Sequence, residues 1–319
     1  MKKTSFKLLI TLLMAAGLTF FFSSCSKEPE IPENETLNKD HENPAKAELL
    51  LVEGHLHGKY GFHQNPDVEG VKYLKKVQKI TYVLTEKGWG ATADGLKQFN
   101  VRSAMKGADG YAVYGLWINY YNAKGDLITK EFIENGQDLI HQHFFIPREV
   151  KPTFDGSVEE KDGNPAELFD YIYCDTDPWN KNMYKEGGKL IGDKNPIGFK
   201  GYFKFNKTRK QFDLSIELMH AAKSKFNDGV ASPYYEPSRA QRQRDHWDLK
   251  IKVPVVIYAN QEEYIESDTD TPEDQIPANE MKYLNSIGKA YNISWKEALM
   301  DLTVLFNGDV NPESGQLWF

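Results

Sequence analysis

Hydrophobic and polar residues mostly alternate from residue 48 to residue 259, and β-branched and aromatic side chains fill many of the apolar positions. Successive side chains along a β-strand point to opposite faces, so a period of two predicts strands with one buried face. Clusters of Gly, Asn, Asp and Lys separate the apolar runs, as turns do. The strands predicted in this way span residues 49–57, 78–86, 99–104, 112–121, 127–133, 139–146, 199–205, 212–220 and 246–258.

Short polar segments at residues 122–125, 134–137 and 206–209 have the composition of tight turns, and we expect each to join two consecutive strands. Residues 147–196 and 224–245 are rich in Gly, Pro and charged side chains, which predicts long loops. Many strands joined by short turns and long loops favour a mainly β fold. The fold class predicted is an antiparallel β-sandwich or open barrel.

Beyond residue 262 the apolar spacing changes to that of a helix. Residues 279–291 place their large apolar side chains on one helical face. Ser294 followed by Glu297 is a capping box, which predicts a second helix ending near Gly308. We therefore expect residues 263–319 to form a helical hairpin that packs on a β-domain.

The first residues have the pattern of an export signal. Three lysines precede an apolar run at residues 8–22, which together form the basic and apolar regions of a signal peptide. The run ends in Phe-Ser-Ser-Cys, which resembles the lipobox of bacterial lipoproteins. The resemblance implies that residues 1–24 are removed and that Cys25 is acylated, with palmitate or a similar chain, and anchors the protein in a membrane.

Residues 25–46 follow this cysteine and are rich in Glu, Asn and Pro, so they cannot bury enough apolar surface to fold. We predict a flexible tether that holds the β-domain, residues 47–262, away from the membrane. A lysine followed by acidic residues just after Cys25 also resembles the export signal of surface-displayed Gram-negative lipoproteins. The expected location is the outer membrane, at the cell surface or otherwise facing the periplasm.

The charge balance excludes some partners. The formal net charge of −7 becomes −10 once the signal peptide and its three lysines are removed. Such an acidic chain does not favour nucleic acid and attracts cations rather than anions. Cys174 is the only cysteine besides Cys25, so the sequence offers neither an intramolecular disulfide nor a CxxC zinc site.

Four of the eight histidines lie in two His-x-His triplets, each inside a predicted strand. The triplets are His55-Leu56-His57 and His141-Gln142-His143. Residues two apart on a strand share a face, so one strand can direct two imidazoles at one ion. Imidazole is the commonest protein ligand for transition metals, and the triplets therefore predict a metal site.

Strand parity places Glu53, His55 and His57 on one face and His141 and His143 on one face of the second strand. The opposite faces are apolar, and we expect them to contact the core. If the strands are neighbours, the four imidazoles complete one site, with Glu53 as a further ligand or as a support for the ligands. Separate sites and ordinary histidines remain alternatives, because one sequence does not show which strands are adjacent.

The other histidines are weaker candidates. His63 lies six residues beyond His57 in a glycine-rich stretch and is a possible further ligand. His220 shares strand parity with apolar residues, which favours a hydrogen-bonded histidine at the edge of the core. His246 lies on a polar strand face and His41 in the tether, so neither is expected to be a ligand.

Nitrogen-rich ligation favours Zn, Cu, Ni or Fe over calcium or magnesium, which prefer oxygen ligands. The chain has no HExxH or G-x-S-x-G motif, so the sequence favours a binding protein over an enzyme without deciding between them. The leading hypothesis is a lipoprotein that captures a transition-metal ion at the cell envelope and delivers it to an outer-membrane transporter. Since a ligating imidazole must be neutral, metal affinity is expected to fall below pH 6.5 or so.

Two alternative functions remain, one that uses the histidines and one that uses aromatic residues. Two of the histidines could hold a haem iron from opposite sides, among the aromatic residues of the domain. A third class is an adhesin or glycan-binding module that uses exposed Trp89, Trp117 and Trp179 as sugar platforms. Those tryptophans are also what a sandwich core contains.

Overall fold

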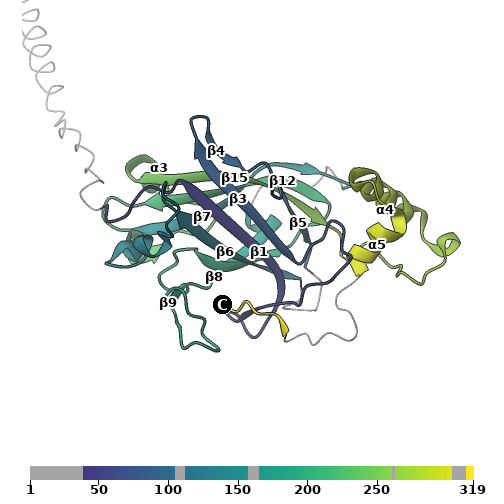
Figure 1. Ribbon diagram of the computed structural model, residues 1–319, viewed down its shortest axis with the longest axis horizontal. Helices are drawn as coiled ribbons and strands as arrows, with labels where there is room; N and C mark the ends of the chain where they lie inside the picture. The colour runs from purple at the N-terminus through teal and green to yellow at the C-terminus, as the bar shows by residue number, and fades with distance from the viewer. Residues whose placement is uncertain (1–38, 105–111, 157–164, 261–262, 304–313) are drawn as a thin grey trace, which may run out of the picture. The chain divides into compact units, whose positions relative to one another are not determined.

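The computed structural model describes residues 39–104, 112–156, 165–260, 263–303 and 314–319, all within one compact unit (Figure 1). The fold is mainly β with a C-terminal pair of helices, as the sequence predicts. Cys25, the signal peptide and the predicted helix end near Gly308 lie outside the described residues. In the part of the chain that is described, no helix is long and apolar enough to cross a membrane.

The first sheet has seven strands, paired antiparallel in the order β4-β3-β1-β6-β11-β8, with β2 paired to the end of β1. Its strands are β1 (Lys46–Leu56), β2 (Phe62–Gln64), β3 (Val77–Thr85), β4 (Gly88–Ala91), β6 (Val113–Tyr121), β8 (Phe169–Tyr173) and β11 (Lys200–Phe205).

The second sheet has four strands in the order β5-β15-β12-β7, in which only the β5–β15 pair is parallel. These strands are β5 (Phe99–Arg102), β7 (His141–Pro152), β12 (Lys210–His220) and β15 (His246–Tyr258). Two short ribbons are β9 (Thr176–Asp177) with β10 (Lys189–Leu190), and β13 (Phe226–Asn227) with β14 (Val230–Ala231).

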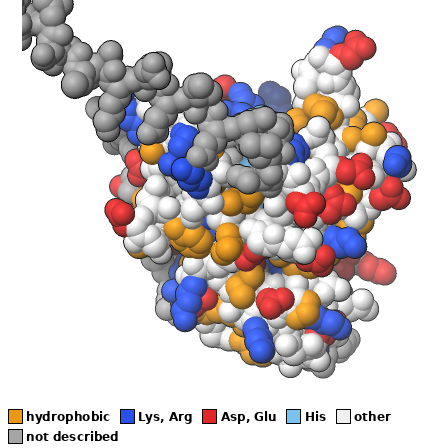
Figure 2. Space-filling model, turned by 90° about the vertical axis from the view of Figure 1, so that its left-hand side faces the viewer, with side chains coloured by type: hydrophobic (Ala, Val, Ile, Leu, Met, Phe, Trp, Pro, Cys, Tyr) orange, Lys and Arg blue, Asp and Glu red, His pale blue; other side chains and the backbone are white. Residues whose placement is uncertain are grey.

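The main core lies between the two sheets, because its buried side chains come from both. Leu49 and Leu51 of β1 belong to the same buried cluster as Ile216 of β12 and Ile251 of β15. Tyr82 of β3 also donates a hydrogen bond across the sandwich to a backbone carbonyl of β15, at 2.7 Å. On the face seen in Figure 2, acidic and basic side chains are interspersed with apolar ones.

The helical hairpin consists of α4 (Ala278–Tyr291) and α5 (Trp295–Thr303), which pack on the end of β15. Leu284 and Leu299 are fully buried in a second cluster together with Tyr258. Ser294 and Glu297 form the predicted capping box, with reciprocal bonds of 3.2 and 2.9 Å. Two short α-helices, α2 (Pro165–Leu168) and α3 (Arg239–Arg244), also lie in the described residues.

Four local predictions were wrong. The long loop predicted at residues 147–196 contains the end of β7, the strand β8 of the first sheet and the ribbon of β9 and β10. Residues 127–133 are not a strand: Leu127 makes a single bridge to β6, and the chain then turns into the 3-10 helix η2 (Thr129–Phe132). The hydroxyl of Thr129 accepts a bond from the Tyr120 backbone, which fastens this turn to β6. The strand predicted to begin at residue 139 begins at His141, because residues 137–139 form a second 3-10 helix, η3 (Gln137–Leu139). Residues 206–209 connect β11 of the first sheet to β12 of the second, so they do not join two strands of one sheet. A third 3-10 helix among the described residues is η4 (Glu273–Gln275).

Candidate metal centres

The structure does not assemble the single site predicted from the two His-x-His triplets. The triplets lie on β1 and β7, which belong to different sheets. His143 contacts Tyr120, which pairs with Ala47 near the start of β1, whereas His55 lies eight residues further along that strand. Eight residues of strand span roughly 26 Å at about 3.3 Å per residue, so the two triplets lie toward opposite ends of the sandwich.

The prediction that the strand faces opposite the histidines contact the core was also wrong. Leu49 and Leu51 share parity with Glu53 and His55, and they point into the core between the sheets. Phe145, which shares parity with His141 and His143, joins the same core. The histidine faces of both strands are therefore the inward faces, and smaller apolar clusters cover the outer ones.

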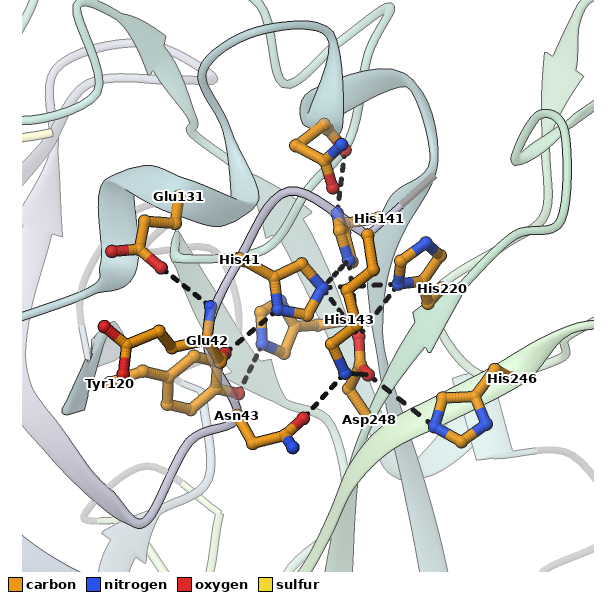
Figure 3. Close-up of polar contacts among 12 residues, drawn as sticks. His41, Glu42, Asn43, Tyr120, Glu131, His141, His143, His220, His246 and Asp248 are labelled. Carbon is orange, nitrogen blue, oxygen red and sulfur yellow. Dashed lines mark hydrogen bonds and ion pairs between the residues drawn. The ribbon is translucent and has the colours of Figure 1, made fainter. Parts of the chain in front are cut away.

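The first group of candidate ligands, which we call the buried centre, consists of His41, His141, His220 and Asp248 (Figure 3). Strand register explains three of them: His141 begins β7 and pairs with His220 at the end of β12, and Asp248 follows two residues after the partner of His220 on β15. His41 comes from the segment that precedes β1. Three neighbouring strands and one crossing segment thus direct four side chains at one point.

Four ligand atoms of the buried centre are close to equidistant. Oδ2 of Asp248 lies 3.3 Å from Nε2 of His41, Nε2 of His141 and Nδ1 of His220. Nε2 of His41 lies 3.2 Å from Nε2 of His141 and 3.3 Å from Nδ1 of His220. A tetrahedral ion with bonds of about 2.0 Å separates its ligand atoms by about 3.3 Å, so these separations fit such an ion.

Hydrogen bonds to carbonyls orient two of the rings. Nδ1 of His41 lies 3.0 Å from the carbonyl of Glu42, and Nδ1 of His141 lies 2.8 Å from that of Gln137. A carbonyl only accepts, so each Nδ1 carries the proton and each Nε2 of a neutral ring directs a lone pair at the centre. Two such lone pairs cannot hydrogen-bond to each other, whereas a cation between them binds both.

The buried centre is closed to solvent. The side chains of the three histidines are 0% exposed and that of Asp248 is 1% exposed. Burial lowers the pKa of His141 to about 4, and the neighbouring His220 and His41 act in the same direction. A neutral His141 beside an ionised carboxylate has the protonation state that metal binding requires.

His143 lies beside this centre but does not belong to it. Its Nδ1 donates to the carbonyl of Ile197 at 2.8 Å, and its Nε2 lies 2.7 Å from the hydroxyl of Tyr120. Both ring nitrogens therefore have hydrogen-bond partners, and the side chain is fully buried. Burial lowers the pKa of His143 to about 3, so the ring is neutral and supports the core.

Two buried neutral histidines should make the domain sensitive to acid. The unfolded chain takes up protons on His141 and His143 near their ordinary pKa of 6.5, whereas the folded chain does so only near 4 and 3. The unfolded state therefore binds more protons below pH 6.5, and each ring steepens the loss of stability by up to about 1.4 kcal/mol per pH unit. Urea unfolding in the presence of a chelator, from pH 7.5 to 4.5, measures this slope. His143→Gln should reduce the slope of unfolding free energy against pH, whereas the control His246→Ala, which removes an exposed histidine, should not. Equal slopes in wild type and both variants would contradict the prediction.

Glu53 is held in a buried ion cluster rather than at a candidate metal centre. Its carboxylate lies 2.5 Å from Nζ of Lys76, 2.8 Å from the guanidinium of Arg102 and 3.2 Å from the hydroxyl of Tyr114. Burial would raise the pKa of Glu53, but Arg102 and Lys76 outweigh it and lower that pKa to about 2. Two cations thus occupy the carboxylate that the sequence offered as a ligand.

The second group, which we call the three-histidine group, consists of His55, His57 and His63. His55 pairs with His63 where β1 meets β2, and His57 follows the end of β1. Nε2 of His55 lies 3.1 Å from Nε2 of His57, and Nδ1 of His55 lies 2.8 Å from the side-chain oxygen of Asn65. The hairpin thus brings together three of the predicted ligands, including His63.

Sequence reasoning missed three members of the buried centre. His220 and Asp248 lie on strands whose neighbours a single sequence does not reveal, and the only signal was the inward parity of His220. His41 lies in a polar segment that reads as tether, and yet its side chain is fully buried against the sandwich. His246, the remaining histidine, lies 3.7 Å from the other oxygen of Asp248 and is outside both groups.

The described part of the chain therefore contains two groups of side chains that could hold a metal ion. Comparison with protein-family models, with curated proteins and with solved structures found no match to this chain.

Proposed function

We propose that this protein binds a transition-metal ion at the buried centre, and that it does so at the cell envelope as a lipid-anchored protein for metal capture or delivery. One observation carries the proposal: four potential ligand atoms from four different segments converge with separations of 3.2–3.3 Å. Lys39 pairs with the other oxygen of Asp248 at 3.2 Å, but nothing separates the two imidazole lone pairs that face each other in a water-excluded site, which is unfavourable without a cation between them. A bound ion removes that repulsion.

The geometry favours zinc among the candidate metals. Five of the six separations among the four atoms are 3.2–3.3 Å. A square plane with bonds of about 2.0 Å would require four pairs at about 2.8 Å and two at about 4 Å, as for Cu(II). Three nitrogen ligands and one oxygen ligand in a tetrahedron suit Zn²⁺, which has no preference of its own for a planar arrangement.

Closure of the site favours holding an ion over catalysis. A catalytic ion needs an open coordination position, and every ligand side chain here is at most 1% exposed. The close convergence of the atoms also supports a single small ion over haem, whose two axial imidazoles stand on opposite faces of a broad macrocycle. Outside the centre lies a hollow lined by His41, Asn135, four acidic residues (Asp40, Glu42, Glu131 and Glu134) and two lysines (Lys39 and Lys130). The acidic residues outnumber the lysines, which favours entry of a cation by this route.

We propose the lipid anchor from the N-terminal sequence. His41 lies at the end of the tether that follows this anchor and is also a ligand of the proposed ion. The segment that carries His41 crosses the sandwich immediately before β1. Glu42 donates its backbone N–H to Glu131 at 2.8 Å, and Ala45 donates to the carbonyl of Tyr121 at 2.8 Å. Because this segment both covers the centre and supplies one ligand, metal binding would fasten the end of the tether to the domain.

Metal analysis of the purified full chain, produced without a histidine tag, tests the proposed function. The protein is loaded in turn with Zn, Cu, Ni and Fe, dialysed and analysed for bound metal. We expect at least one tightly held ion, with zinc held best. A chain that retains no ion after loading with any of the four metals would overturn the proposal.

Metal should also protect the segment around His41 from proteolysis. Cleavage after Lys39 requires this segment to detach, and detachment removes a ligand from the ion. With metal at about 100 times its dissociation constant, cleavage should slow by up to about a hundredfold. Limited trypsin digestion with mass spectrometry measures the rate, and cleavage after the exposed Lys87 in the turn between β3 and β4 serves as an internal control. Equal protection in wild type and His41→Ala would contradict the role given to His41.

A further inference from the structure

We infer that the three-histidine group is a second, independent site for a divalent transition-metal ion, and that a small exchangeable ligand from solvent completes its coordination. The inference does not depend on the buried centre, since the two groups share no residue. The expected exchangeable ligands are water and small nitrogen or anionic donors, including those of a molecule that brings the metal.

The hairpin of β1 and β2 fixes the spacing of the three rings. One nitrogen from each of His55, His57 and His63 lies within 4.8 Å of the others. The ring centroid of His55 lies 4.9 Å from that of His57 and 4.9 Å from that of His63. Because His55 and His63 are paired across the hairpin, one turn of backbone holds the whole group.

Supporting hydrogen bonds fix the tautomers of two rings. Nε2 of His63 donates to the carbonyl of Gly315 at 2.8 Å, so the neutral ring offers Nδ1 as its ligand atom. Nδ1 of His55 donates to the oxygen of Asn65, whose amide nitrogen in turn lies 3.5 Å from Glu53. The Glu53 cluster therefore orients His55 through Asn65, which is a supporting role like that of carboxylates behind metal-bound histidines.

The site is graded from buried to exposed. His63 is fully buried, His55 is half-buried and His57 is exposed. The ring of Trp318 stacks on His63 at 3.7 Å and on His57 at 5.1 Å, and this forms one wall of the site. The side at His57 thus faces solvent, which leaves room for a ligand that is not part of the protein.

Exposure and charge distinguish the two sites chemically. At the buried centre a carboxylate offsets part of the ion's charge and water is excluded, which favours slow release. Three neutral imidazoles leave the full charge of a divalent ion, and contact with solvent provides entering ligands. We therefore expect the three-histidine group to bind more weakly and to exchange its ion faster than the buried centre.

Co(II) with azide as the added ligand tests the inference on the full chain. Wild type should bind two Co(II) ions, and azide should change the visible absorption of one of them. His55→Ala/His57→Ala should bind one ion whose spectrum ignores azide. His141→Ala/His220→Ala should also bind one ion, and azide should change its spectrum fully. Paramagnetic quenching of Trp318 fluorescence should accompany only the azide-sensitive ion.

A matched control is His246→Ala, which removes an exposed histidine outside both groups and should leave two ions bound. The inference is overturned if His55→Ala/His57→Ala binds as much Co(II) as wild type, or if azide leaves the wild-type spectrum unchanged. A different result is expected if the buried centre binds no ion. Wild type would then bind a single Co(II) ion with an azide-sensitive spectrum, and His55→Ala/His57→Ala would bind none. If His141→Ala/His220→Ala does not fold, the comparison of wild type with His55→Ala/His57→Ala decides the question.

Discussion

Replacing His141 and His220 together by alanine is expected to abolish tight zinc binding and to remove the stabilisation that zinc provides. Half of the ligand set comes from these two paired residues, and removal of a supporting residue alone already costs a metal site about 10–100-fold in affinity. At a free zinc concentration 1,000 times the dissociation constant, binding stabilises the folded wild type by about 4 kcal/mol. For a domain of roughly 270 residues that corresponds to a rise in Tm of about 7 °C.

Thermal unfolding of both proteins, with zinc and with a chelator, measures this difference. Wild type should show the full rise, and the double variant should keep at most the small part of it that the weaker three-histidine group supplies. The matched control is His55→Ala/His57→Ala, which also removes two histidines from the inward face of one strand and its extension. It should retain most of the rise. An equal zinc-dependent shift in all three proteins would place the stabilising ion somewhere other than the buried centre.

Replacing Glu53 by glutamine is expected to destabilise the fold by about 3–5 kcal/mol, because it leaves buried positive charges without their counter-charge. Lys76 and Arg102 are each about 2% exposed, so water cannot replace the lost carboxylate. Burial lowers the pKa of Lys76 to about 8 even with Glu53 present, which shows how little solvent stabilises that ammonium group. We expect Glu53→Gln to lower the free energy of unfolding and to leave zinc binding at the buried centre unchanged.

Urea unfolding measures the stability of Glu53→Gln, and metal analysis of the folded variant measures its zinc. The matched control is Glu48→Gln on the same strand, where the carboxylate pairs with Lys46 and Lys79 near the surface. Such partly exposed pairs contribute about 0–1 kcal/mol, so this variant should be nearly as stable as wild type. If Glu53→Gln kept its stability and lost the tightly held zinc, Glu53 would be a ligand after all.

The fold was predictable because local pattern and global packing agree in most of the chain. Alternation identified the long strands of both sheets, and the capping box at Ser294 located the start of α5. Residues 127–133 are apolar enough for a strand, but the bond from Tyr120 to Thr129 winds them into a helical turn instead. Such a contact between segments has no signature in a window of sequence.

The candidate site was only partly predictable, because parity specifies a face and not a position along the strand. His55 and His141 do point to the same side of their sheets, toward the interior, but the register of β1 with β6 separates them. The ligands that join His141 come from its neighbours in the sheet and from a crossing segment. His41 in particular is polar tether by composition and becomes a ligand only through its position over β7 and β12.

X-ray absorption at the zinc edge of His55→Ala/His57→Ala, loaded with one equivalent of zinc, identifies the ligands of the ion at the buried centre. We predict a four-coordinate ion with three imidazole nitrogens and one carboxylate oxygen at about 2.0–2.1 Å. A spectrum with fewer than two imidazoles, or with a shell of water oxygens only, would contradict a metal centre built from His41, His141, His220 and Asp248.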